Sequence, residues 1–144
     1  MSRILAVDYG QKRTGLAVTD PLQIIANGLD TVSSNDIVDY LKKYFSREDV
    51  ELVVIGYPKQ MNNAPSDAVR YVNEFIRKFE KNFPDIKYVL MDERFTSKMA
   101  LQTMIDGGIK KQQRRDKALV DKISATIILQ SYMEMKANSQ NNIV

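Results

Sequence analysis

Three acidic residues, Asp8, Glu93 and Asp121, are the candidates for chemistry in this sequence. Asp8 ends a short apolar run and Glu93 follows another, as expected for acids at the ends of buried strands. Asp121 shares a helical face with apolar residues, where an acid is costly to bury unless it is paired or metal-bound. Carboxylates brought together repel one another unless a cation neutralises them. A pair of Mg²⁺ or Mn²⁺ ions held by such acids would activate a water and stabilise the leaving oxygen of a phosphodiester.

Each acid also has an ordinary structural role open to it. Asp8 could cap the turn that follows its strand through a side-chain oxygen. Glu93 could pair with the neighbouring Arg94, and Asp121 could complement a helix dipole as an acid near a helix N-terminus. Helical periodicity does not bring Asp121 to the other two acids, so the residues alone leave both readings open.

The composition excludes most other catalytic chemistry. The chain of 144 residues has no Cys and no His, so disulfides, thiolate nucleophiles, imidazole bases and His-ligated metals are ruled out. Its 44% hydrophobic and 27% charged content is that of a globular protein. We expect one domain over residues 1–136 and a frayed polar tail over 137–144. With no signal peptide or membrane-spanning stretch in view, we expect a cytoplasmic setting and no membrane partner.

The net charge of +3 is unevenly distributed. Residues 1–108 hold 14 basic and 15 acidic side chains, whereas residues 109–144 hold 7 and 3. A basic segment in that last quarter surrounds the single acid Asp116 and consists of Lys110, Lys111, Arg114, Arg115 and Lys117. Such a segment is either a solvated loop or a phosphate-contacting surface, because clustered cations attract polyanions.

Apolar runs predict five strands, over residues 3–8, 14–19, 28–32, 51–56 and 86–91. Helical spacing predicts four helices, one capped by Ser33 or Ser34, and three over residues 68–83, 96–108 and 117–134. Strands joined by short turns pair antiparallel, and strands reached through a helix pair parallel. The predicted fold class is therefore α/β, with a mixed sheet of three antiparallel then two parallel strands and helices on both faces. The first, fourth and fifth strands then end at one sheet edge, where α/β proteins bind ligands.

Four segments resemble the motifs of the RuvX (YqgF) family. D-Y-G-Q-K-R-T-G-L-A-V-T-D at 8–20 is similar to its opening signature, and G-Y-P at 56–58 to its G-x-P loop. D-E-R-F-T-S at 92–97 resembles its D-E-R-x-T-[TS] motif, and V-D-K-I-S-A-T-I-I-L-Q-S-Y-M at 120–133 resembles its last helix. The four motifs occur in order along nearly the whole chain.

The resemblance implies an RNase H-like fold and a nuclease acting on the 5′ end of pre-16S ribosomal RNA or on Holliday junctions. It implies that Asp8, Glu93 and Asp121 are the catalytic acids and bind two Mg²⁺ or Mn²⁺ ions. The residues expected to contact nucleic acid are Lys12, Arg13, Arg94, Lys110, Lys111, Arg114, Arg115 and Lys117.

Three functions follow as hypotheses. The first is a metal-dependent nuclease for a structured RNA precursor, and the second is a resolvase of four-way DNA junctions, which needs paired active sites. The sequence leaves open whether the protein is a monomer or a homodimer. The third is an inert nucleic-acid-binding module. A nucleotide-binding ATPase also uses a D-x-G hairpin, but it needs two such domains, and 144 residues are too few.

Overall fold

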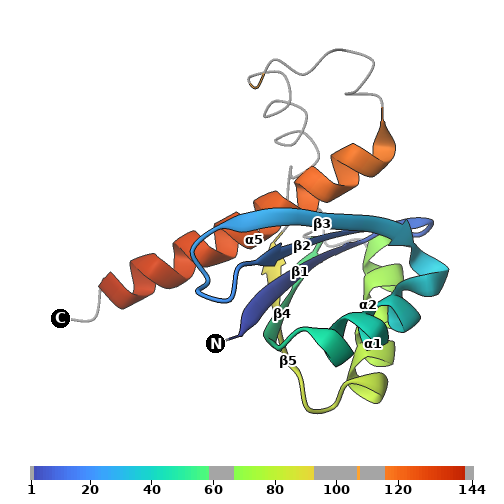
Figure 1. Cartoon of the computed structure of the whole chain (residues 1–144). Helices are drawn as coiled ribbons and strands as arrows, with labels where there is room; N and C mark the ends of the chain where they lie inside the picture. Colours follow the sequence, from blue (N-terminus) through green and yellow to red (C-terminus); the bar gives the residue numbers. More distant parts are fainter. Residues whose placement is uncertain (1, 59–66, 93–106, 108–115, 142–144) are drawn as a thin grey trace.

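The computed structural model describes residues 2–58, 67–92, 107 and 116–141 (Figure 1). The elements in chain order are β1 (Arg3–Tyr9), β2 (Arg13–Thr19), β3 (Ala26–Ser33), a 3-10 turn η1 (Ser34–Asp36), α1 (Ile37–Arg47), β4 (Val50–Tyr57), α2 (Asp67–Asn82), β5 (Lys87–Asp92) and α5 (Lys117–Asn141). The helix predicted over residues 96–108 lies, apart from Gly107, outside the described residues.

The five strands form one mixed sheet in the order β3-β2-β1-β4-β5. β1 pairs antiparallel with β2, and β2 pairs antiparallel with β3. β4 pairs parallel with β1, and β5 parallel with β4, each after a connection that contains a helix. The predicted sheet of three antiparallel and two parallel strands is therefore confirmed.

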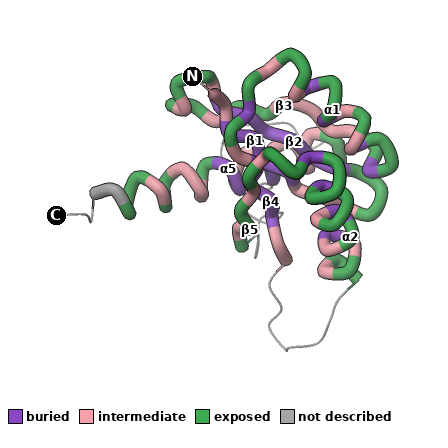
Figure 2. Tube along the Cα trace, turned by 90° about the horizontal axis from the view of Figure 1, so that it is seen from below, coloured by how far each residue is buried: buried purple, intermediate pink, exposed green. Residues whose placement is uncertain are grey.

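Helices cover both faces of the sheet, α1 and α2 on one and α5 on the other (Figure 1). Alternate strand residues supply two separate cores, and the central strands are buried on both sides, as Figure 2 shows in purple. This explains why β1 and β4 read as unbroken apolar runs. The core on the α1–α2 face includes Leu5, Val7, Leu16, Val53, Ile55, Phe75 and Phe79. The core under α5 consists of Ile4, Ala6, Ala17, Val54, Ala125, Ile128 and Leu129.

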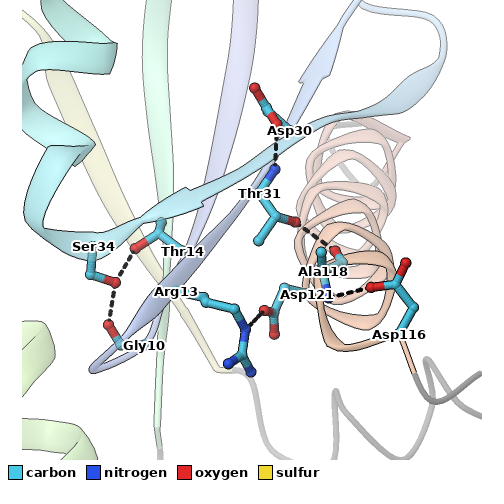
Figure 3. A network of polar contacts seen from close by, with 9 residues as sticks. All are labelled: Gly10, Arg13, Thr14, Asp30, Thr31, Ser34, Asp116, Ala118 and Asp121. Carbon is cyan, nitrogen blue, oxygen red and sulfur yellow. Dashed lines mark hydrogen bonds and ion pairs between the residues drawn. The ribbon is translucent and has the colours of Figure 1, made fainter.

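The predicted serine cap of the first helix is wrong. Neither Ser33, before the 3-10 turn, nor Asp36, before α1, makes a side-chain cap hydrogen bond. The Ser34 hydroxyl instead donates to the Gly10 carbonyl at 2.6 Å and is hydrogen-bonded to the Thr14 hydroxyl at 2.8 Å (Figure 3). Both hydroxyls are buried, so they satisfy each other and the turn rather than a solvent-exposed helix end.

The predicted end of the last helix at Glu134 is also wrong, because α5 continues to Asn141. Lys136 and Ala137 line a hollow with Ile4 and Leu22, so the extra turn has neighbours on the body of the protein. Adding residues to an existing helix costs little compared with nucleating one. None of the helices in the described part of the chain is long and apolar enough to cross a membrane.

Candidate active site

Asp8 lies at the end of β1 on the face of the sheet that α5 covers. Ile4 and Ala6 pack under α5, and side chains alternate along a strand, so Asp8 points to the same side. Its directly opposite partner on β2 is Gly15. Since opposed residues of antiparallel strands have Cα atoms about 4.5–5.5 Å apart, whatever contacts Gly15 on this face is close to Asp8.

The backbone of Asp121 makes that contact. A Cβ atom on Gly15 would lie 2.1 Å from the Asp121 carbonyl oxygen and 3.2 Å from its Cα. Only a residue without a side chain allows α5 to come this close to β2. The glycine therefore brings Asp121 to the strand that pairs with Asp8, which helical periodicity alone did not predict.

Two polar contacts fix the start of α5 over this position (Figure 3). The Arg13 Nε donates to the Asp121 Oδ2 at 2.7 Å, in an ion pair whose side chains are 41% and 23% exposed. On the other side, the Thr31 hydroxyl donates to the Ala118 carbonyl at 2.5 Å. Thr31 is the β3 partner of Gly15, so both contacts flank the point of closest approach.

Asp121 does not serve as the N-terminal acid of the helix, which was its alternative role. Asp116 does so, because its carboxylate accepts a hydrogen bond from the Ala118 amide at 3.0 Å (Figure 3). Asp121 lies one turn further along and is paired to Arg13 of β2 instead. The apolar neighbours expected on its face are buried or pack against the core: Ala125, Ile128 and Tyr132.

A tight turn between β1 and β2 carries the two cations of the opening motif, Lys12 and Arg13. The Gly10 amide donates to the Arg13 carbonyl at 3.0 Å, and a Cβ on Gly10 would lie 2.6 Å from that same oxygen. The Lys12 carbonyl accepts a hydrogen bond from the Ser34 amide. Lys12 and Arg13 are both exposed, and Arg13 pairs with Asp121.

The ends of the parallel strands share one edge, as predicted. The register pairs Val7 with Ile55 and Gly56 with Met91, so Asp8 is level with Gly56 and Met91. Asp92 ends β5 opposite Tyr57.

The remaining site predictions lie at the limits of what the structure describes. Glu93 follows Asp92 in the chain but is outside the described residues, with Arg94, Lys110, Lys111, Arg114 and Arg115. Lys117 is described and is the first residue of α5. Within the described ranges, no group of three or more acids is close enough to hold a metal ion.

Sequence reasoning missed the residues that assemble the site: Gly15, Thr31 and Ser34. The one available signal was a glycine inside the apolar run T-G-L-A-V-T, which marks either a bulge or a close backbone approach.

This sheet order, with an acid at the end of its first strand, defines an α/β domain of the RNase H-like class. Two RuvC structures share the fold. T. thermophilus RuvC in complex with a Holliday junction substrate aligns with a TM-score of 0.59 and 16% identity, over 95% of this chain and 96% of that one. A second Thermus thermophilus RuvC structure aligns with a TM-score of 0.54 and 14% identity, over 94% and 96%. At such identities the likeness shows the fold alone.

The chain belongs to the RuvX family, whose model, described as a Holliday junction resolvase, matches residues 2–135. A Flavobacterium psychrophilum relative is 59% identical over 136 residues, covering 94% of this chain and 99% of the relative. A Phocaeicola vulgatus relative is 58% identical, covering 94% and 98%. Both carry a provisional name as pre-16S rRNA nucleases. Family membership makes the chain a nuclease, which hydrolyses phosphodiester bonds and binds nucleic acid. The resemblance seen in the four motifs is thus confirmed.

Proposed function

We propose that this chain is a metal-dependent nuclease that processes the 5′ end of pre-16S ribosomal RNA, with Asp8, Glu93 and Asp121 as its catalytic acids. The observation that supports it best is the close approach of Asp121 to Gly15, the strand partner of Asp8. Two of the three acids thereby start from neighbouring backbone on one face of the sheet, and the third comes directly after β5 in the sequence, a strand that ends at the same edge.

The donor chemistry of these residues fits Mg²⁺ or Mn²⁺. Both ions prefer carboxylate oxygens, and a site built only from acids needs neither the His nor the Cys that the chain lacks. When bound, a pair of such ions supplies an activated water and stabilises the leaving oxygen of the phosphodiester. Asp8, Asp121 and Glu93 would hold them.

Arg13 orients Asp121 before a cation binds. Its guanidinium holds one carboxylate oxygen at 2.7 Å and neutralises a charge that would otherwise repel Asp8. The pair is partly exposed, and such pairs contribute only about 0.2–1 kcal/mol, so Asp121 could exchange Arg13 for a divalent cation at little cost. Arg13 directly follows Lys12 and both are exposed, so both could contact the substrate phosphates.

An RNA precursor is the preferred substrate because relatives up to 59% identical carry that name. A ribosomal precursor also implies that the protein works in the cytoplasm. The second candidate is the four-way DNA junction, which is supported by the family description and by the RuvC fold with its junction substrate. A resolvase requires two active sites at once, so this candidate requires a dimer.

Cleavage of both substrates side by side tests the proposal. Wild-type protein and Glu93→Gln are incubated with Mn²⁺ and either a 5′ precursor fragment of 16S rRNA or a synthetic four-way junction. The proposal predicts cleavage of the RNA by the wild type and its loss in Glu93→Gln. Cleavage of the junction alone would support the second candidate, and no cleavage of either would leave only a binding module.

A further inference from the structure

A second hollow lies at the catalytic edge, on the opposite face of the sheet from Asp121. It has a volume of about 270 Å³ and lies between the β1–β2 turn and the start of α2. Its described lining residues are Tyr9, Gly10, Gln11, Asp67, Ala68 and Tyr71. Tyr9 and Gly10 directly follow Asp8 in the chain, so the hollow begins one residue beyond a proposed catalytic acid.

Two of the residues that line this hollow are aromatic. The Tyr9 ring is stacked on Phe75, with centroids 4.8 Å apart and an interplanar angle of 15°. The second ring, Tyr71, is partly exposed at the start of α2.

The lining chemistry does not suit a phosphate. None of the described lining residues is Lys or Arg, and the charged one is Asp67. The neighbouring Arg70 pairs with Asp67 at 3.0 Å, and its guanidinium lies 5.7 Å from the centre of the Tyr71 ring. A carboxylate, an amide and two phenol rings are groups that recognise the hydrogen-bonding edge and the flat face of a nucleobase.

We propose that this hollow binds one unstacked nucleobase of the substrate, next to the phosphate that is cleaved, with Tyr71 as the stacking platform. The turn between β1 and β2 connects the two places, because Arg13 pairs with Asp121 on one side and Gln11 lines the hollow on the other. A strand that crosses this turn places a phosphate at the acids and a neighbouring base against Tyr71. Single-stranded and unpaired segments supply such bases. This inference rests on the proposed nuclease function.

Abasic substitution combined with mutation of Tyr71 tests the proposal. The substrate is whichever of the two nucleic acids the wild type cleaves, prepared with a single abasic nucleotide at each position flanking the cleavage site. Binding is measured by fluorescence anisotropy with Asp8→Asn protein, which is expected to bind without cleaving. We expect one position where the missing base weakens binding about fivefold or more. Adding Tyr71→Ala should weaken binding of the intact substrate to a similar extent and leave the abasic substrate unaffected.

Two further variants separate stacking from structural damage. Tyr71→Phe keeps the ring, so it should bind within about twofold of the parent. Tyr88→Ala removes a partly buried tyrosine near the start of β5, away from the end at Asp92, and should leave the dependence of binding on the abasic position unchanged. The inference is overturned if Tyr71→Ala binds the substrate as tightly as the parent protein. It is also overturned if the affinity lost through Tyr71→Ala and the affinity lost through the missing base are additive at every position. If the wild type cleaves neither nucleic acid, the proposed function itself has failed, which is a different result.

Discussion

Replacing Gly15 with alanine tests the contact that brings the two described acids together. In Gly15→Ala the new Cβ would lie 2.1 Å from the Asp121 carbonyl oxygen, whereas ordinary contacts begin at 3.4 Å. Helix α5 must therefore move away from β2 by more than an ångström, since the obstacle is backbone and cannot rotate aside. Asp121 moves with it, away from the strand partner of Asp8.

This displacement sets the expected losses of stability and of cleavage rate. Overpacking a tight contact costs about 1–3 kcal/mol of unfolding free energy. A shift of about 1 Å in a catalytic group costs on the order of 100-fold in rate. Gly15→Ala should thus lose about 1–3 kcal/mol in urea unfolding and about 100-fold in cleavage rate, measured while the protein is still folded.

Gly28→Ala is the matched control, because Gly28 faces the same helix from the next strand. There the new Cβ would meet the Lys122 side chain, at 3.2 Å from Cδ and 3.4 Å from Cγ, and that flexible chain can swing aside. Its stability should stay within about 0.5 kcal/mol of the wild type, with cleavage unchanged. Equal stability and equal cleavage rates in the two variants would refute the close approach of Asp121 to Gly15.

Three further predictions concern the β1–β2 turn beside the site and the β2–β3 loop at the opposite end of the sheet. Arg13→Gln removes the cation that competes for Asp121, so the affinity for Mn²⁺ measured by titration calorimetry should rise about two- to fivefold. Lys12→Gln should leave the Mn²⁺ affinity unchanged and lower the slope of log K against log salt concentration for RNA binding by about one. A weaker Mn²⁺ affinity in Arg13→Gln would contradict the competition between Arg13 and the metal for Asp121. Thr14→Val removes one hydroxyl of the buried Thr14–Ser34 pair and should lower the free energy of unfolding by about 1–2 kcal/mol in urea; an unchanged urea midpoint would count against this. Hydrogen bonds from the backbone amide of Ile25 and from neighbouring amides hold the pKa of Asp20 below its usual value. The ionised Asp20 therefore stabilises the fold at neutral pH, and this stabilisation is lost as the pH falls below about 4. In Asp20→Asn the free energy of unfolding should therefore fall less steeply as the pH is lowered through this range. An unchanged pH dependence would contradict the role of Asp20.

The strands were predictable because burial on two faces leaves a local record. β1 and β4 are apolar at successive positions, and a continuous apolar run between turn signals is typical of a covered strand. The order of strands and helices then fixed their pairing through general rules of connection. The position of Asp8 at the sheet edge therefore followed from the sequence.

The contacts between elements left no such record. The placement of Asp121 depends on Gly15, which is 106 residues away in the chain, and on an ion pair with Arg13. Ser34 looked like a helix cap because that role needs only local sequence, yet its actual partners are the Gly10 carbonyl on the β1–β2 turn and the Thr14 hydroxyl. In each case the deciding partner comes from a distant element, so periodicity and spacing could not identify it.

The central claim is that the carboxylate at the end of β1 is part of a metal-dependent nuclease site. The most direct measurement is Mn²⁺-dependent cleavage of a 5′ precursor fragment of 16S rRNA by the wild type and by Asp8→Asn, with urea unfolding of both proteins as the check on folding. Asp8→Asn removes one charge and keeps the side-chain shape, so it should fold like the wild type. The claim predicts cleavage by the wild type that stops when EDTA removes the metal, and no cleavage by Asp8→Asn. A folded Asp8→Asn protein that cleaves at the wild-type rate would contradict it.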